Sequence, residues 1–235
     1  IGSSTINVTG LTPRQEYKLW MRSKCSGGVY SEWSFEPLRF TTACEYIYTV
    51  DEDFDNLSVG SLPECWSKIS SGTTFPSVVT SHAYYGVKSK SIKFGDSNGQ
   101  YLVLPRFAVP LKTLQLDFML NRLNANACTF QVGYMTDPTD ARTFEAVASF
   151  DDKIYKRMLH KRVFFNDVAD GNNRYIAFRY GSVGSETFSY NSYYWLDSIR
   201  VQAAPSCLHP TREKVLFISS DSVVVTYKSN ATAIR

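Results

Sequence analysis

The chain has few of the residues that bind transition metals. Its three histidines, His82, His160 and His209, lie far apart, and its five cysteines include no Cys-x-x-Cys pair. Structural zinc sites need closely spaced Cys and His ligands, so a zinc site is not expected.

The chain also lacks an excess of charge of one sign and long apolar runs. Its 25 basic and 22 acidic residues give a net charge of +3, without the basic excess that is typical of nucleic-acid-binding proteins. No apolar run approaches the length of a membrane-spanning helix. We therefore expect neither nucleic acid as a partner nor insertion into a membrane. No signal peptide is visible, and because the sequence begins with Ile1, we expect it to be part of a longer protein.

Aromatic residues, in contrast, are abundant, with 15 Tyr and 15 Phe. In residues 128–135, Cys128, Phe130, Val132 and Tyr134 share one parity, and this period of two predicts a β-strand with one apolar face. The chain has no convincing amphipathic helix pattern, so the predicted fold class is all-β, a β-sandwich. The strands expected in its central part are 50–55, 91–94, 101–105, 114–120, 128–135, 144–150, 162–165, 174–180 and 193–201.

The two ends of the chain carry other strand patterns. Leu11-Thr12-Pro13 is followed by Tyr17, and then by Ser31-Glu32-Trp33-Ser34 and Phe40-Thr41-Thr42. Residues 1–43 thereby resemble the C-terminal part of a fibronectin type III domain, which is an immunoglobulin-like sandwich. The resemblance implies that the Tyr17 hydroxyl bonds back to the preceding turn.

Residues 204–235 resemble the N-terminal part of a second fibronectin type III domain. Strands are expected at 214–218 and 222–227, with Tyr227 where that family usually has a core Trp. An incomplete sandwich leaves an edge unpaired. We therefore expect each half-domain to be truncated, with neighbouring repeats of the same chain beside it, or to be complemented by strands from another copy.

Residues 45–203 resemble the cleaved-adhesin family, which is related to the MAM and concanavalin-like jelly rolls of Bacteroidetes surface proteins. The motifs that carry the resemblance are Glu52-Asp53-Phe54-Asp55, Leu62-Pro63-Glu64-Cys65-Trp66, Tyr101-Leu102-Val103-Leu104-Pro105, residues 132–138, residues 174–179 and Trp195-Leu196-Asp197-Ser198-Ile199. The resemblance implies a jelly-roll module and an extracellular or bacterial cell-surface location, hence oxidising conditions. It further implies a disulfide between Cys44 and Cys65, and it leaves Cys25 and Cys207 unpaired within this chain. Cys128 lies on the apolar face of its strand and is expected to be a buried, inert thiol.

Acidic residues at strand ends are candidates for a structural calcium site. Asp197 shares parity with Trp195, Ile199 and Val201, and an ionised carboxylate on an apolar face needs a partner. Glu52 is placed similarly beside Phe54. The resemblance implies structural calcium near these positions, so the candidate ligands are Glu52, Asp55 and Asp197. Alternatively, Asp197 pairs with Arg174 or Arg179, or accepts hydrogen bonds from backbone N–H groups.

Two aromatic segments are candidates for ligand binding, because Tyr and Trp combine an apolar ring with a polar group. The candidate residues are Tyr84, Tyr85, Tyr190, Tyr193 and Trp195. The alternative is that these loops simply pack on the edge of the sandwich. Residues 153–162 form a basic cluster that is either a solvated hairpin or a contact for acidic glycans or proteins.

The predicted function is that of a repeat segment of a large secreted or cell-surface adhesin, which binds a host glycan or protein or serves as a stalk module. One alternative is a carbohydrate-binding module attached to an exported enzyme. A concanavalin-like glycosidase needs two solvent-facing carboxylates across a cleft, and the inward-facing acids fit this poorly. The segment is therefore not expected to be an enzyme.

Overall fold

The computed structural model describes residues 5–82, 86–123, 128–150, 157–169, 171, 175–182, 192–207 and 211–228. The chain forms two compact units, Ile1–Ile47 and Tyr48–Arg235. Helical residues in the described part are confined to short 3₁₀ turns, which include η1 (Ser26–Gly28), η3 (Leu111–Thr113) and η4 (Ala141–Thr143). No helix in these ranges has the length and apolar character needed to span a bilayer.

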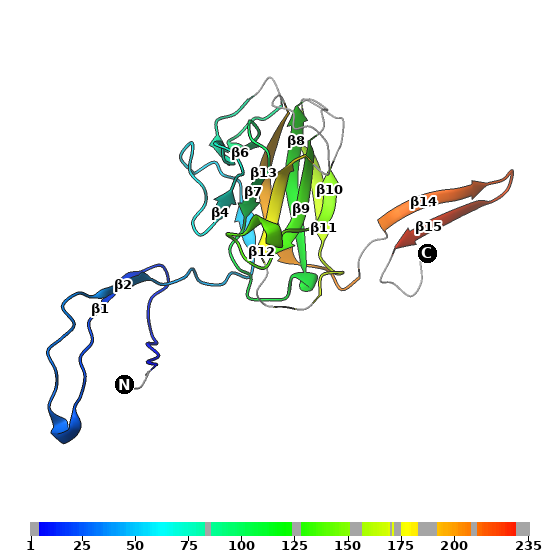
Figure 1. The fold of residues 1–235 in the computed structure, drawn as a ribbon. Coiled ribbons are helices and arrows are strands. Elements are labelled where there is room, and N and C mark those ends of the chain that lie inside the picture. The colour runs from blue at the N-terminus through cyan, green and yellow to red at the C-terminus, as the bar shows by residue number, and fades with distance from the viewer. Residues whose placement is uncertain are drawn as a thin grey trace. The chain divides into compact units, whose positions relative to one another are not determined.

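The second unit contains a sandwich of two antiparallel sheets (Figure 1). The five-stranded sheet has the order β10 (Glu145–Phe150), β9 (Thr129–Met135), β12 (Tyr175–Gly181), β7 (Gln100–Val103) and β4 (Ser67–Ile69). The six-stranded sheet contains β11 (Leu159–Phe164), β8 (Leu114–Leu123), β13 (Tyr193–Ala203), β6 (Ser91–Phe94) and β5 (Ser77–Val79), and β3 (Val50–Glu52) pairs with β13. The all-β prediction is confirmed. The short strands β4 and β5 were not predicted, because three residues are too few to show a period of two.

The core lies between the two sheets and is largely aromatic. Phe130 on β9 contacts Phe94 on β6 and Tyr194 on β13, with ring centroids 5.2 and 5.1 Å apart. Phe118 on β8 meets Phe178 on β12 at 5.4 Å. All five side chains are almost fully buried. The apolar residues that alternate along β9 in the sequence therefore form the face that packs on the opposite sheet.

The other face of the five-stranded sheet is also partly covered. Tyr101, Val103, Met135 and Ala177 form a second buried cluster, and Phe144, which follows η4, packs against it. Met135 is fully buried although it has the opposite parity to Tyr134. The segment that contains η4 covers this face, so its strands carry apolar residues at both parities.

The first unit contains a two-stranded sheet of β1 (Glu16–Leu19) and β2 (Leu38–Thr41). The backbone N–H of Thr12 donates a hydrogen bond of 2.8 Å to the Tyr17 hydroxyl, which is the contact to the preceding turn that was expected. Near the chain's C-terminus, β14 (Thr211–Ile218) and β15 (Val223–Lys228) form an antiparallel hairpin.

Candidate functional site

A groove lies on the outer face of the six-stranded sheet, the face that points away from the five-stranded sheet. Its volume is about 270 Å³, and it is lined by Asp51, Asp117, Met119, His160, Arg162, Ser198, Arg200 and Gln202. These residues come from β3, β8, β11 and β13. The walls of the groove are therefore side chains on paired strands, which hold them more rigidly than loops would.

Strand register places acidic and basic side chains alternately across the groove. Arg162 on β11 is opposite Asp117 on β8. Asp117 is also opposite Arg200 on β13, and Arg200 is opposite Asp51 on β3. The row Asp51, Arg200, Asp117, Arg162 thus alternates in sign, and opposite charges at facing positions attract each other.

The Asp117 carboxylate is the most heavily hydrogen-bonded group in the groove. Its Oδ1 atom accepts a hydrogen bond from Arg162 Nε at 2.7 Å and lies 2.9 Å from His160 Nε2. Its Oδ2 atom accepts one from Gln115 Nε2 at 2.8 Å. The side chain of Asp117 is 11% exposed, whereas those of Arg162 and His160 are 40% and 56% exposed. A fixed acceptor thus lies at the base of the groove with donors around it.

The second ion pair of the groove is open to solvent. Arg200 Nη2 lies 2.9 Å from Asp51 Oδ2, and their side chains are 56% and 75% exposed. Exposed pairs of this kind contribute only about 0.2–1 kcal/mol to stability. The Arg200 guanidinium therefore remains available to a ligand at little cost to the fold.

A β-bulge in β13 forms one end of the groove. The register with β8 shifts between Asp197 and Arg200, and Ser198 has a φ of 50°. The shift turns Ile199 inward and Arg200 outward. The prediction that Asp197 faces the same side as Ile199 and Val201 is therefore wrong, because an extra residue reverses the alternation.

The three predicted calcium ligands accept hydrogen bonds from groups of the chain itself. Glu52 Oε1 accepts from the Phe54 N–H at 2.6 Å, and Asp55 Oδ1 accepts from the Lys90 N–H at 3.0 Å. Asp197 accepts from Ser89 Oγ at 2.8 Å and from the Ser198 N–H at 2.6 Å.

Burial is the main cause that raises the pKa of Asp197. The charge of Asp55 raises it further, while the hydrogen bonds from Ser89 and Ser198 oppose the rise. Of the partners proposed for Asp197, the backbone N–H is present, through Ser198. Arg179 instead donates to the Tyr101 hydroxyl, to the Gln131 side chain and to the Ser182 carbonyl, and Arg174 lies outside the described residues.

A lysine of the protein bonds to the backbone of the loop that carries Asp55. Lys90 Nζ donates to the carbonyl oxygens of Asp55 and Leu57 at 2.8 and 2.7 Å. In the ranges that the structure describes, no group of three or more His, Cys, Asp or Glu side chains could hold a metal ion. This set of groups does not fit a calcium ion, because the Lys90 ammonium already bonds to the Asp55 and Leu57 carbonyl oxygens and would repel a divalent cation.

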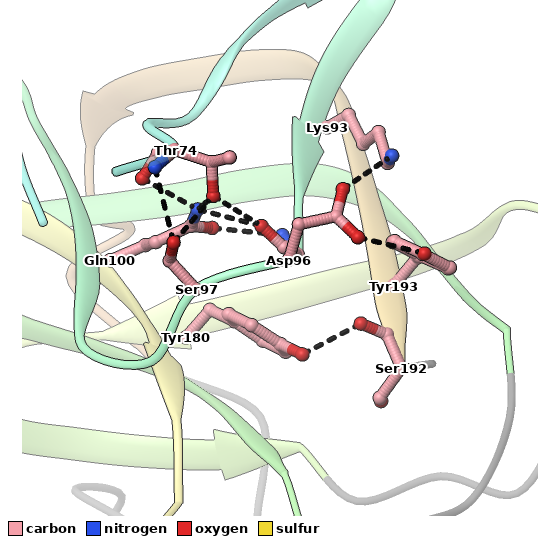
Figure 2. Close-up of polar contacts among 9 residues, drawn as sticks. Thr74, Lys93, Asp96, Ser97, Gln100, Tyr180, Ser192 and Tyr193 are labelled. Carbon is pink, nitrogen blue, oxygen red and sulfur yellow. Dashed lines mark hydrogen bonds and ion pairs between the residues drawn. The ribbon is translucent and has the colours of Figure 1, made fainter. Parts of the chain in front are cut away.

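The predicted aromatic ligand residues are held by the protein where they can be described. The Tyr193 hydroxyl donates to Asp96 at 2.8 Å, and Lys93 Nζ lies 3.0 Å from the same carboxylate and 4.1 Å from the Tyr193 ring centroid (Figure 2). Trp195 is 2% exposed, with its ring 5.9 Å from that of His82. Tyr84, Tyr85 and Tyr190 lie outside the described residues. Trp195 is thus almost fully buried, whereas Tyr193 is half-buried with the Lys93 ammonium over its ring.

A polar network beside Tyr193 fixes the neighbouring loops. The Gln100 side chain, 1% exposed, accepts from the Gly95 N–H and donates to the Thr74 and Gly95 carbonyl oxygens, while Thr74 Oγ1 and Ser97 Oγ are 2.7 Å apart (Figure 2). Tyr180, whose pKa is raised by burial, donates to the Ser192 carbonyl at 2.6 Å. Because these groups bond to one another, the network is structural.

The cysteines fall into three kinds. Cys44 and Cys65 are disulfide-bonded. Cys25 and Cys207 are exposed thiols, and Cys128 is a buried thiol that is 2% exposed. The oxidised cysteines are the ones that the family resemblance implies.

Sequence reasoning missed most of the groove. His160 and Arg162 were noted as part of a basic cluster, of which residues 153–156 lie outside the described residues. Asp117, Arg200 and Gln202 received no role. A signal in the sequence could have found them. Polar residues at every second position of a central strand indicate that the outer face of the sheet is open to solvent and not covered by another apolar layer.

Comparisons with known proteins define the class of fold. No family model matches the chain, and no curated protein matches its sequence. Among solved structures, the K2 cleaved adhesin domain of Lys-gingipain matches with a TM-score of 0.51 and 14% identity, covering 66% of this chain and 98% of that one. The K1 cleaved adhesin domain of Lys-gingipain from Porphyromonas gingivalis W83 matches with a TM-score of 0.48 and 16% identity, over 67% and 99% of the two chains. The galactotriose-bound module TmCBM61 has a TM-score of 0.43 and 8% identity, over 65% and 95%.

The likeness to the K2 domain shows that the sandwich has a cleaved-adhesin type of jelly-roll fold, as the sequence resemblance implies. At this level of identity the match concerns the fold alone.

Proposed function

We propose that the sandwich is a non-catalytic binding module of an exported protein, and that its groove binds a neutral, hydroxyl-rich saccharide. The observation that carries the proposal is the row of alternating carboxylates and guanidiniums that strand register holds across the groove. The disulfide-bonded state of Cys44 and Cys65 supports an oxidising, extracellular location.

The chemistry of the groove suits sugar hydroxyls. A hydroxyl donates one hydrogen bond and accepts others, so a sugar ring needs fixed acceptors and donors side by side. Asp117 supplies the acceptor, and Arg162, Arg200 and Gln202 supply donors. The two aspartates balance the two arginines, which disfavours a strongly anionic ligand.

The size of the groove limits the length of the ligand. Its volume of about 270 Å³ lies just below the range of roughly 300–1,000 Å³ typical of small-molecule sites. A segment of one or two sugar rings fits this space, and Met119 adds a half-buried apolar surface against which a ring face can pack.

The test is binding of the full chain to an array of neutral and acidic glycans, followed by calorimetry on the best neutral ligand. Arg200→Met removes a guanidinium from the groove. Its matched control is Arg142→Met, because Arg142 also forms an exposed ion pair with an aspartate, Asp140, at 2.7 Å, but outside the groove. Charge-assisted hydrogen bonds are worth about 1.5–3 kcal/mol, so Arg200→Met should weaken binding roughly 10-fold or more.

The Arg142 variant should bind like the wild type. Binding of acidic glycans alone, binding of a protein partner without any glycan, or equal affinities for the Arg200 and Arg142 variants would each overturn the proposal.

A further inference from the structure

The loop that follows β3 brings backbone oxygens together. Glu52 Oε1 accepts a hydrogen bond from the Phe54 N–H, and Asp53 Oδ1 accepts one from the Asp55 N–H at 3.1 Å. The Leu57 N–H donates to the Phe54 carbonyl at 3.1 Å, and Phe54 has a φ of 63°. These contacts curl the chain tightly and direct the carbonyl oxygens of Asp55 and Leu57 toward one point.

Lys90 occupies that point. Its Nζ atom lies 2.8 Å from the Asp55 carbonyl oxygen and 2.7 Å from that of Leu57, and its backbone N–H donates to Asp55 Oδ1 at 3.0 Å. The residue is half-buried and directly precedes β6. Lys90 therefore holds the loop after β3 in place, although the two are more than 30 positions apart in the sequence.

A second carboxylate is fixed through the residue before Lys90. Ser89 Oγ donates to Asp197 Oδ2 on β13 at 2.8 Å. Consecutive residues, Ser89 and Lys90, thus bind Asp197 and Asp55. The site combines carbonyl and carboxylate oxygens, which are the ligands that hard cations prefer, but the positive charge comes from the chain.

We propose that the Lys90 ammonium replaces a divalent cation in the loop after β3, so that the sandwich folds and keeps its stability without calcium. A covalently attached ammonium forms hydrogen bonds with the same carbonyl oxygens that would coordinate a metal ion. Because the ammonium is part of the chain, no ion has to be taken up from solution. Its contribution to folding stability is therefore independent of calcium concentration. This inference concerns the loop and does not depend on the function of the groove.

The first experiment measures the thermal unfolding of the full chain in millimolar calcium and in excess EDTA. The wild-type Tm should be the same in both. Lys90→Met, which keeps the aliphatic part of the side chain, should lower the Tm by roughly 2–8 °C. Lys88→Met is the matched control, because Lys88 is an exposed lysine two residues away, and it should leave the Tm unchanged.

The second experiment needs only the wild-type protein and remains decisive if Lys90→Met fails to fold. Trp66 contacts Phe54 at a ring distance of 6.0 Å, next to the loop. A terbium ion bound among these oxygens would therefore show emission sensitised by the indole. We expect no saturable, calcium-competed terbium emission from the wild type. Such emission, a wild-type Tm that calcium raises above its value in EDTA, or equal Tm values for the folded Lys90 and Lys88 variants would overturn the proposal.

Discussion

Replacement of Phe130 by alanine tests whether the aromatic contacts between the two sheets hold the sandwich together. The Phe130 side chain is fully buried. Its ring stacks on Tyr194 at 5.1 Å, meets Phe94 edge-on at 5.2 Å and lies 5.9 Å from Phe178. The substitution therefore removes a ring on β9 that contacts two strands of the opposite sheet, β6 and β13, and the neighbouring strand β12 in its own sheet.

The expected cost follows from these contacts. Burial and cavity effects make Phe→Ala in a core cost about 3–5 kcal/mol, and each aromatic pair adds about 0.5–1.5 kcal/mol beyond buried area. Three ring neighbours place Phe130→Ala near the upper end, at about 4–5 kcal/mol. For a domain of this size the Tm should fall by roughly 8–20 °C. The free energy of unfolding is measured by urea titration, followed by far-ultraviolet circular dichroism.

Phe75→Ala is the matched control in the same domain. Phe75 is 44% exposed, and Lys68 Nζ lies 5.6 Å from its ring centroid. Its replacement should cost less than about 1 kcal/mol. If Phe130→Ala destabilises the protein by no more than Phe75→Ala does, the aromatic layer between the sheets is not the main source of stability and the reasoning fails.

Two further substitutions test the strand packing and the buried acid. Gly133→Ala should cost about 3 kcal/mol, because a Cβ atom there would overlap the Glu145 carbonyl oxygen and lie 2.8 Å from the Phe144 ring; an unfolding free energy equal to that of the wild type would contradict this. The pKa of Asp197 is raised in the folded state, mainly by burial, so its contribution to stability is fully present below the unfolded pKa and is lost as pH rises through the folded one. Asp197→Asn should therefore gain stability relative to the wild type as pH rises from the unfolded pKa of Asp197 through its higher folded pKa, and Tm values that instead fall further below the wild type as pH rises would refute the assignment.

Local patterns predicted most of the strands. Ser91–Phe94 forms β6 over the residues expected, and the alternation in residues 128–135 became β9 with its apolar parity inward. The Tyr17 hydrogen bond to Thr12 was expected from the resemblance to a fibronectin type III domain, and it joins residues only five apart. Each of these features depends on a short stretch of sequence.

The candidate sites depend on residues that are distant in the chain. Asp117, His160 and Arg200 meet only because β11, β8 and β13 pair in one register. The bulge at Ser198 reversed the parity on which the Asp197 prediction depended. Lys90 carries no local sign that it will bond to Asp55 and Leu57.

The sequence by itself determined the all-β class and the inward face of most strands, because a period of two is a local property of the chain and burial of apolar side chains follows from it. Only the tertiary structure decided which polar side chains share the groove and which lysine bonds to the loop after β3. Strand order and register join residues across long separations, and a shift of one residue moves a side chain to the other face of the sheet.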